Sequence, residues 1–158
     1  MTENVKIIKD KLSDKNNKLY KKLFEKCFDE KWESNIPFAD DNIYTVISES
    51  GSLVGFCFVH NSPPYNMGES GSFLYNLCVD TNYRNLGIAT ALIDSVLLDH
   101  PKCYCHMLRD SKLMKNWKKI GVWRDKFVEY ATGFSEVKTQ VDMISSDHYD
   151  AKENIIYL

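Results

Sequence analysis

The segment that most constrains the fold covers residues 73–93, near the middle of the chain. Residues 73–80 are mostly aromatic and aliphatic, which is typical of a β-strand that is buried on both faces. The residues that follow, up to Ile93, repeat apolar side chains at helical spacing, which is typical of an amphipathic helix. The sequence therefore predicts a buried strand, a tight turn and a helix in direct succession.

The turn between this strand and this helix has the composition of an anion-binding site. Arg84 opens the turn, and Gly87 allows the backbone to approach a ligand without a Cβ in the way. Small Ala89 follows in the first helical turn, where amide N–H groups have no partner within the helix. These amides and the positive end of the helix dipole favour a phosphate or pyrophosphate. An ordinary turn without a ligand is the alternative.

The residue pattern of this turn points to one family. Neither Gly-x-Gly-x-x-Gly nor Gly-x-x-x-x-Gly-Lys-Ser/Thr occurs, so dinucleotide-binding and P-loop NTPase folds have no support. The turn instead reads Arg84-Asn85-Leu86-Gly87-Ile88-Ala89. A spacer of three residues, 81–83, separates it from Leu77-Cys78-Val79-Asp80 at the end of the predicted strand. The turn resembles the Arg/Gln-x-x-Gly-x-Gly/Ala signature of the GCN5-related N-acetyltransferases, the GNAT superfamily.

The predicted order of elements is similar to that of the same family. Strands are predicted at residues 5–8, 43–48, 53–59, 73–80, 102–108, 127–131 and 140–144. Helices are predicted from Ser13 or Asp14 to about residue 31, from the signature turn to about residue 100, and from Asp110 or Ser111 to residue 119. The resemblance implies an α/β fold of the α+β type, with a mixed, mostly antiparallel sheet of six to seven strands. Helices would flank this sheet, which would be splayed between strands 4 and 5.

Length and composition agree with one globular domain over residues 1–158. A chain of 158 residues with 44% hydrophobic and 27% charged residues can bury a full core. The net charge of −2 argues against a nucleic-acid partner, and the apolar runs are too short for a membrane span. The first residues lack the apolar core of a signal peptide, and the five cysteines, an odd number, suit a reducing compartment. We therefore expect a cytoplasmic protein.

The run Cys103-Tyr104-Cys105-His106 raises the question of a metal site. Its alternation predicts a strand whose two thiols share one face, and no second pair of ligands at zinc-like spacing lies near it in the sequence. We expect core packing and no metal.

The resemblance implies acetyl-CoA as the cofactor. The wedge between the splayed strands would hold pantetheine through main-chain groups of the fourth strand, amides of residues 85–90 would hold the pyrophosphate, and Arg84 would add a charge-assisted contact. The implied cofactor-binding residues are Leu77, Cys78, Val79, Arg84, Asn85, Leu86, Gly87, Ile88, Ala89, Thr90 and Trp117.

The chemistry that the resemblance implies is direct attack of an amine on the thioester in a ternary complex. A strand amide at Leu77 or Cys78 would stabilise the developing oxyanion. The amine must lose a proton, and Glu69 in the preceding loop is the candidate base. The Cys78 thiol could in principle accept the acetyl group, but a cysteine in a buried apolar strand is a poor nucleophile.

The chain departs from the family at Trp117, where members often carry a tyrosine that protonates the leaving thiolate. An indole cannot act as a general acid, so Trp117 is expected to pack against the pantetheine arm or the core. Tyr75, Tyr104 and Tyr130 are candidate substitutes, with Tyr130 taken as the catalytic candidate, and core packing is the alternative for each.

The acceptor is expected to lie against residues 30–41 and 61–72, which shape the acceptor site in the family. The first segment is acidic and would favour a cationic amine, such as a polyamine or a lysine-containing peptide. A solvated surface is the alternative.

The expected function is acetyl-CoA-dependent N-acetylation of a primary amine, and an inactive acyl-CoA-binding or protein-interaction module stays open. The sequence does not give the oligomeric state, and a homodimer stays open.

Overall fold

The computed structural model describes residues 4–28, 30–63, 70–84, 86–108, 127–130 and 140–145. Within these residues the elements, in chain order, are β1 (Val5–Asp10), α1 (Asn17–Phe28), the 3₁₀ turn η1 (Trp32–Ser34), β2 (Asn42–Ser48), β3 (Leu53–His60), β4 (Ser72–Val79), the 3₁₀ turn η2 (Thr81–Tyr83), α2 (Ile88–Asp99), β5 (Cys103–Leu108), β6 (Phe127–Tyr130) and β7 (Gln140–Ser145). All seven predicted strands are therefore present. The predicted helix that ends at residue 119 lies outside the described residues.

The chain divides into two compact units. The first contains Met1–His60 and Leu74–Val96, and the second contains Asn61–Phe73 and Leu97–Leu158. The predicted splay between the fourth and fifth strands involves one strand from each unit, and it stays a prediction. The assignment of residues 1–158 to a single domain also stays a prediction.

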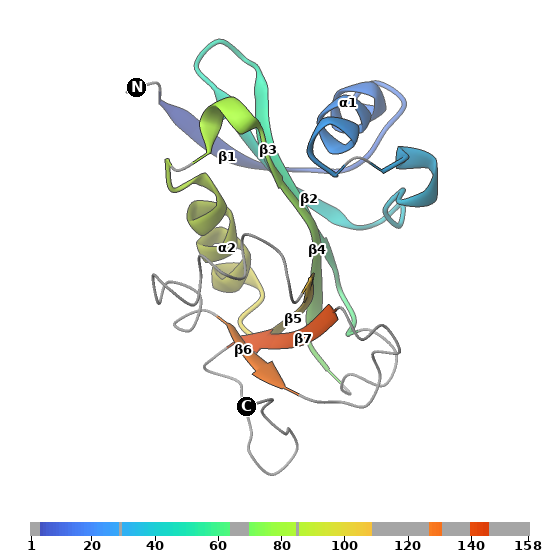
Figure 1. The fold of residues 1–158 in the computed structure, drawn as a ribbon, viewed down its shortest axis with the longest axis vertical. Coiled ribbons are helices and arrows are strands. Elements are labelled where there is room, and N and C mark those ends of the chain that lie inside the picture. The colour runs from blue at the N-terminus through green and yellow to red at the C-terminus, as the bar shows by residue number, and fades with distance from the viewer. Residues whose placement is uncertain are drawn as a thin grey trace. The chain divides into compact units, whose positions relative to one another are not determined.

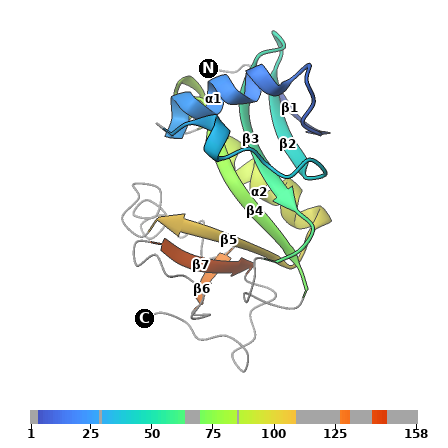
Figure 2. The ribbon, with the colours of Figure 1, turned by 90° about the vertical axis from the view of Figure 1, so that its right-hand side faces the viewer.

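The first unit is a sheet with a helix on each face. Its strand order is β1-β2-β3-β4. β1 pairs antiparallel with β2, with Ile7 opposite Val46, and β2 pairs antiparallel with β3, with Tyr44 opposite Cys57. The turn between β2 and β3 contains Gly51 at φ 85°, so the predicted hairpin is confirmed. Figures 1 and 2 show α1 and α2 on opposite faces of these strands.

Helix α1 begins beside Ser13, as predicted, and buries one stripe of side chains. The Asn16 amide donates to Ser13 Oγ at 3.4 Å, and the Ser13 amide donates to Asn16 Oδ1 at 2.7 Å, so the two residues cap the chain reciprocally before Asn17. Tyr20, Leu23 and Phe24 follow at helical spacing and are buried. They form one core cluster with Trp32, Ile43, Phe56, Phe58 and Cys78. The helix ends at Phe28, three residues before the predicted end.

Helix α2 packs on the opposite face of the first unit. Leu92, Ile93 and Val96 are buried on its inner side. A Cβ added to Gly55 of β3 would lie 3.1 Å from the Cys78 carbonyl oxygen and 3.4 Å from Ile88 Cγ2, so this glycine allows the close approach of β3, β4 and α2. None of the helices in the described part of the chain is both long and apolar enough to span a bilayer.

The prediction that the signature strand is buried on both faces is wrong. In β4, Leu74 and Cys78 are buried, whereas Tyr75, Leu77 and Val79 are only half-buried. Strand β3 is instead buried at six consecutive positions, Val54 to Val59. The reason is that both helices pack against β3, which the apolar composition of β4 does not reveal.

The second unit contains the strands β5, β7 and β6 in that order, with antiparallel pairing. Cys103, Tyr104 and Cys105 are buried, which confirms that both thiols pack in the core. Because all three consecutive residues are buried, the strand is covered on both faces. Among the described residues, no cluster of His, Cys, Asp and Glu side chains could hold a metal ion.

Candidate cofactor-binding and active site

The signature turn forms the N-terminus of α2. Gly87 has φ 79°, a conformation that disfavours residues with a Cβ, and α2 begins at the next residue. The Ala91 amide donates to the Gly87 carbonyl oxygen at 3.0 Å. The amides of Ile88, Ala89 and Thr90 precede this bond and belong to the first helical N–H groups, which have no partner within the helix. The space where a Gly87 Cβ would lie is open, so a ligand can approach the backbone there.

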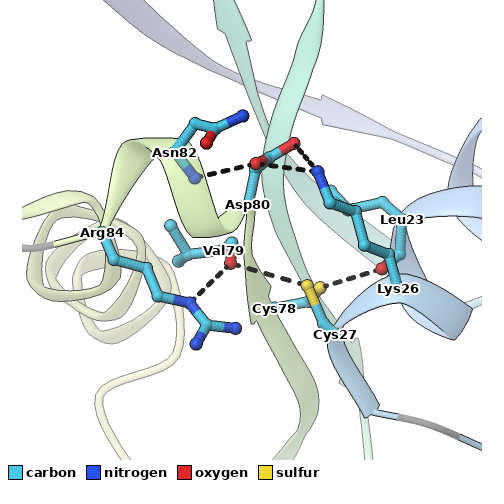
Figure 3. Close-up of polar contacts among 8 residues, drawn as sticks. All are labelled: Leu23, Lys26, Cys27, Cys78, Val79, Asp80, Asn82 and Arg84. Atoms are coloured by element: carbon cyan, nitrogen blue, oxygen red, sulfur yellow. Dashed lines mark hydrogen bonds and ion pairs between the residues drawn. The ribbon is translucent and has the colours of Figure 1, made fainter.

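Arg84 lies beside this helix terminus and reaches back to the end of β4. Its Nε donates to the Val79 carbonyl oxygen at 3.2 Å (Figure 3). The bond holds the guanidinium near the strand end, where it adds a positive charge to that of the helix dipole. Asn85 lies outside the described residues, and the Leu86 side chain is exposed.

The turn is fastened to α1 through Asp80. Both Asp80 carboxylate oxygens accept from Lys26 Nζ at 3.2 Å, and Oδ1 also accepts from the Asn82 amide at 3.0 Å (Figure 3). Burial opposes ionisation of this carboxyl, but the Asn82 and Lys26 contacts outweigh it and lower its pKa. The carboxylate therefore stays ionised and holds η2 in place.

Two thiols meet between α1 and β4 in the same region. Cys27 Sγ lies 3.5 Å from the Val79 carbonyl oxygen, and Cys78 Sγ lies 3.6 Å from the Leu23 carbonyl oxygen (Figure 3). The neighbouring Cys27 thiol and burial raise the pKa of Cys78. An un-ionised, buried thiol is a poor acetyl acceptor, which agrees with a main-chain role for Cys78 in the sequence-based prediction.

Strand β4 carries a backbone irregularity directly before Leu77. Asn76 has φ 52°, and among the described residues it is the one non-glycine residue with a positive φ. A left-handed residue inside a strand interrupts the alternation of the side chains and turns the neighbouring peptide groups out of the regular ladder. The irregularity therefore sits beside the Leu77 amide, the predicted oxyanion donor. The only signal in the sequence was an asparagine, which tolerates this conformation, in an otherwise apolar strand.

A buried carboxylate joins two polar side chains from neighbouring strands. Asp41, which is 4% exposed, accepts from the Tyr75 hydroxyl through Oδ2 and lies 2.6 Å from His60 Nδ1 through Oδ1. Phe38 stacks on the His60 ring, with 4.5 Å between the centroids. This Asp41–His60–Tyr75 cluster lies in the first unit, at the start of β2, the end of β3 and the middle of β4.

The geometry of the cluster favours one arrangement of protons. Burial and the Asp41 carboxylate raise the pKa of Tyr75, so Tyr75 stays protonated and donates its hydrogen to Asp41. A carboxylate that accepts from His60 Nδ1–H leaves Nε2 as the basic nitrogen of the ring. Sequence reasoning did not consider His60, because a single histidine at a strand end has no distinctive local signal.

The remaining predicted residues are placed as follows. The structure brings Leu77, Cys78, Val79, Arg84 and residues 86–90 together in the first unit. Tyr104 is buried in the second unit, so its side chain packs in the core there. Glu69 and Trp117 lie outside the described residues, and Tyr130 falls in β6 with its side chain outside them. Their predicted roles stay predictions.

A cavity of about 510 Å³ lies between α1 and the first strands of the sheet. Asp10, Tyr20 and Thr45 are among its lining residues, but Leu77, Val79, Arg84 and Gly87 are not. Lys26 and Asp80 also line it, so the cavity adjoins the contact that fastens the signature turn to α1.

Comparisons with known proteins identify the family. The model of the Acetyltransferase (GNAT) family matches residues 10–109, well over half of the chain. No curated protein matches the chain. An acetyltransferase of the GNAT family from Staphylococcus aureus Mu50 is similar in structure, with a TM-score of 0.59 and 17% sequence identity over 89% of this chain and 98% of that one.

Two further solved structures show the same fold. Arabidopsis thaliana NAA60, in complex with a bisubstrate analogue, has a TM-score of 0.60 and 18% identity over 89% of this chain and 98% of that one. The ribosomal-protein-S18-alanine N-acetyltransferase from Escherichia coli has a TM-score of 0.59 and 10% identity over 97% and 96%. The predicted fold class, a mixed and mostly antiparallel sheet flanked by helices, is thereby confirmed. This chain belongs to the GNAT acetyltransferase family.

Proposed function

We propose that this protein is an acetyl-CoA-dependent N-acetyltransferase that transfers the acetyl group directly to a primary amine. The observation that carries the proposal is the turn at Gly87, where a positive φ, open space and the first amides of α2 occur together with Arg84. Membership of the GNAT family supports acyl transfer from an acyl-CoA in general. The choice of acetyl-CoA and of an amine acceptor belongs to the proposal.

The residues of the first unit fit the phosphates and the pantetheine arm of this cofactor. The amides of Ile88, Ala89 and Thr90, with the helix dipole, would hold the pyrophosphate, and the Arg84 guanidinium would add a charge-assisted contact. Main-chain groups of Leu77, Cys78 and Val79 would hold the pantetheine arm. When bound, acetyl-CoA supplies an activated acetyl thioester. The Leu77 amide beside the Asn76 irregularity would then stabilise the negative charge that develops on the carbonyl oxygen.

His60 is our candidate for the group that accepts the proton of the incoming ammonium, directly or through one water molecule. Asp41 would hold the ring by Nδ1 and so present Nε2 as the base. Tyr75 would act only by positioning Asp41, since its own hydrogen is already donated there. This assignment complements the sequence-based candidate Glu69.

In residues 30–41 one carboxylate, that of Asp41, is buried in its cluster, and Glu33 forms an exposed ion pair with Lys21 at 2.9 Å. Ile36 and Phe38, in contrast, expose 54% and 65% of their surface. We therefore propose an amine that carries an apolar portion beside its cationic group, such as a peptide with an N-terminal or lysine amine, with polyamines as the comparison.

The experiment that tests the cofactor site is a calorimetric titration with acetyl-CoA, with ADP and NAD as controls for general phosphate binding. We expect saturable binding at one site with a preference for acetyl-CoA. Arg84→Ala should weaken it by about 10-fold or more, because a hydrogen bond to a charged group contributes ~1.5–3 kcal/mol. Lys18→Ala, which removes a charge from the exposed face of α1, is the matched control.

Turnover separates the enzyme from the alternative module. Thiol release from acetyl-CoA, measured with peptides and polyamines, should appear with at least one amine. Cofactor binding without thiol release from any amine would favour an acyl-CoA-binding module. Absence of binding at millimolar acetyl-CoA would overturn the site assignment.

A further inference from the structure

Cys27 and Cys78 form a pair of thiols that lie against each other. Cys27 belongs to α1 and Cys78 to β4, and each sulfur contacts a carbonyl oxygen of the other element, at 3.5 Å and 3.6 Å. These two crossed contacts place the sulfurs near each other, as Figure 3 shows, and the two thiols influence each other's ionisation. None of the five cysteines, all within the described residues, is in a disulfide.

The surroundings of the two thiols make them chemically different. The Cys78 thiol lowers the pKa of Cys27; burial opposes this effect, and the Arg84 guanidinium supports it. The pKa of Cys78 is raised by Cys27 and by burial. Cys27 is therefore the more readily ionised thiol and the nucleophile of the pair, while Cys78 keeps its proton.

Access also differs between the two sulfurs. Cys27 is half-buried, so a small solute can reach it, whereas Cys78 is 2% exposed. The other three cysteines, Cys57, Cys103 and Cys105, are at most 4% exposed. Cys27 is thus the most accessible thiol of the chain, and Cys78 lies next to it.

We propose that Cys27 and Cys78 form an oxidation site, at which a peroxide oxidises Cys27 and Cys78 then closes an intramolecular disulfide between α1 and β4. The ligand class of this site is a small peroxide, such as hydrogen peroxide.

The two steps balance. The Cys27 thiolate attacks one peroxide oxygen, the O–O bond breaks, hydroxide leaves, and Cys27 becomes a sulfenic acid. The Cys78 sulfur then attacks the Cys27 sulfur, the S–O bond breaks, and the leaving oxygen departs as water with the Cys78 proton. Two thiols lose two electrons in total, and the peroxide is reduced to water. A thiol reductant reverses the disulfide by exchange.

The disulfide would change the candidate cofactor site. Cys27 would lose its contact with the Val79 carbonyl oxygen and its negative charge beside Arg84, and the Cys78 side chain would be drawn toward α1. Residues 77–79 and Arg84 are those that we propose for acetyl-CoA, so oxidation is expected to weaken its binding. This consequence rests on the proposed function, whereas the oxidation site itself does not.

The experiment is mass spectrometry of the full chain after treatment with hydrogen peroxide under native conditions. We expect a mass loss of about 2 Da, for the two hydrogens removed, that a thiol reductant restores. Proteolysis without reduction should give a peptide containing Cys27 linked to one containing Cys78. Cys27→Ser and Cys78→Ser should each abolish this link, and Cys78→Ser should accumulate a sulfenic acid at Cys27. Cys57→Ala, at a buried cysteine outside the pair, is the control that should keep the link.

Three results would overturn the proposal: no linked peptide once Cys27 is oxidised, a link to another cysteine, or a link that persists in Cys27→Ser. The peptide map of the unmodified chain decides the question even if a variant fails to fold. A calorimetric titration of the oxidised and the reduced chain with acetyl-CoA then separates the two proposals. A disulfide that forms in a chain that binds no acetyl-CoA would leave the oxidation site standing and the proposed function refuted.

Discussion

Asn76 is the residue at which the backbone departs most from its surroundings. Its φ of 52° lies inside β4, and its Nδ2 donates to the Asn35 carbonyl oxygen at 3.4 Å. A β-branched residue in this conformation is strained, so Asn76→Val should lower the free energy of unfolding by about 1–2 kcal/mol. Urea denaturation of the variant checks this value. Asn76→Gly, which removes the strain, should cost less.

Asn42→Val is the matched control for this change, since Asn42 also lies in a strand but has no positive φ. If both valine variants lost the same stability, the strain at Asn76 would be excluded as the cause.

His60 tests the proposed proton acceptor. For an amine that the protein acetylates, His60→Gln should lower kcat by about 10²- to 10⁴-fold, the usual contribution of general acid–base catalysis, and leave the affinity for acetyl-CoA unchanged. The measurement is kcat for that amine, beside a calorimetric titration with acetyl-CoA. Tyr75→Phe, which removes a positioning contact only, should have a smaller effect on kcat. Full kcat in His60→Gln would show that another group accepts the proton.

At the scale of elements, η1 holds residues 30–41, which we propose to face the acceptor, against α1. Trp32 is 1% exposed, packs on Phe24 and Phe58, and donates through Nε1 to Asn17 Oδ1 at 3.0 Å. Trp32→Ala should therefore lower the free energy of unfolding by about 3–5 kcal/mol, as expected for a large aromatic side chain in a core. Ile36→Ala, in the same segment but at an exposed side chain, should change it by no more than about 0.5 kcal/mol. Chemical denaturation of both variants makes the comparison, and equal losses would show that η1 does not anchor the segment.

At the scale of the whole molecule, stability should decline at alkaline pH because of a buried tyrosine. Tyr20 is 2% exposed, its hydroxyl lies 2.8 Å from Thr45 Oγ1, and burial raises its pKa to about 12. The raised pKa means that the protonated form is favoured in the folded chain. Its contribution to stability is full below the unfolded pKa of about 10 and is lost as the pH rises through about 12.

The expected loss of stability over this range is about 2–3 kcal/mol, because a tenfold change in a proton-binding constant corresponds to about 1.4 kcal/mol. Urea unfolding at a series of pH values should show a steeper decline between about pH 10 and 12 in the native chain than in Tyr20→Phe. Between about pH 6 and 8 the two curves should run parallel, which serves as the internal control. Equal slopes in the alkaline range would contradict the role of Tyr20.

The sequence predicted the parts of this protein that short-range physics determines. Residues 84–89 follow a strand and open α2, the β2–β3 hairpin turns at Gly51, and Ser13 marks the start of α1, because helical period, strand alternation and turn chemistry are all local properties. The family also followed from the local pattern at the signature turn.

Tertiary structure decided which distant side chains meet. Asp41 contacts His60 and Tyr75, which are 19 and 34 positions away, and Cys27 meets Cys78 across α1 and β4. The full burial of β3 and the partial burial of β4 likewise depend on the helices that pack against β3. No local pattern encodes such contacts, because they arise only when separate strands and helices pack against one another. The fold and the turn at the start of α2 could therefore be predicted from the sequence, whereas the proposed base and the thiol pair required the structure.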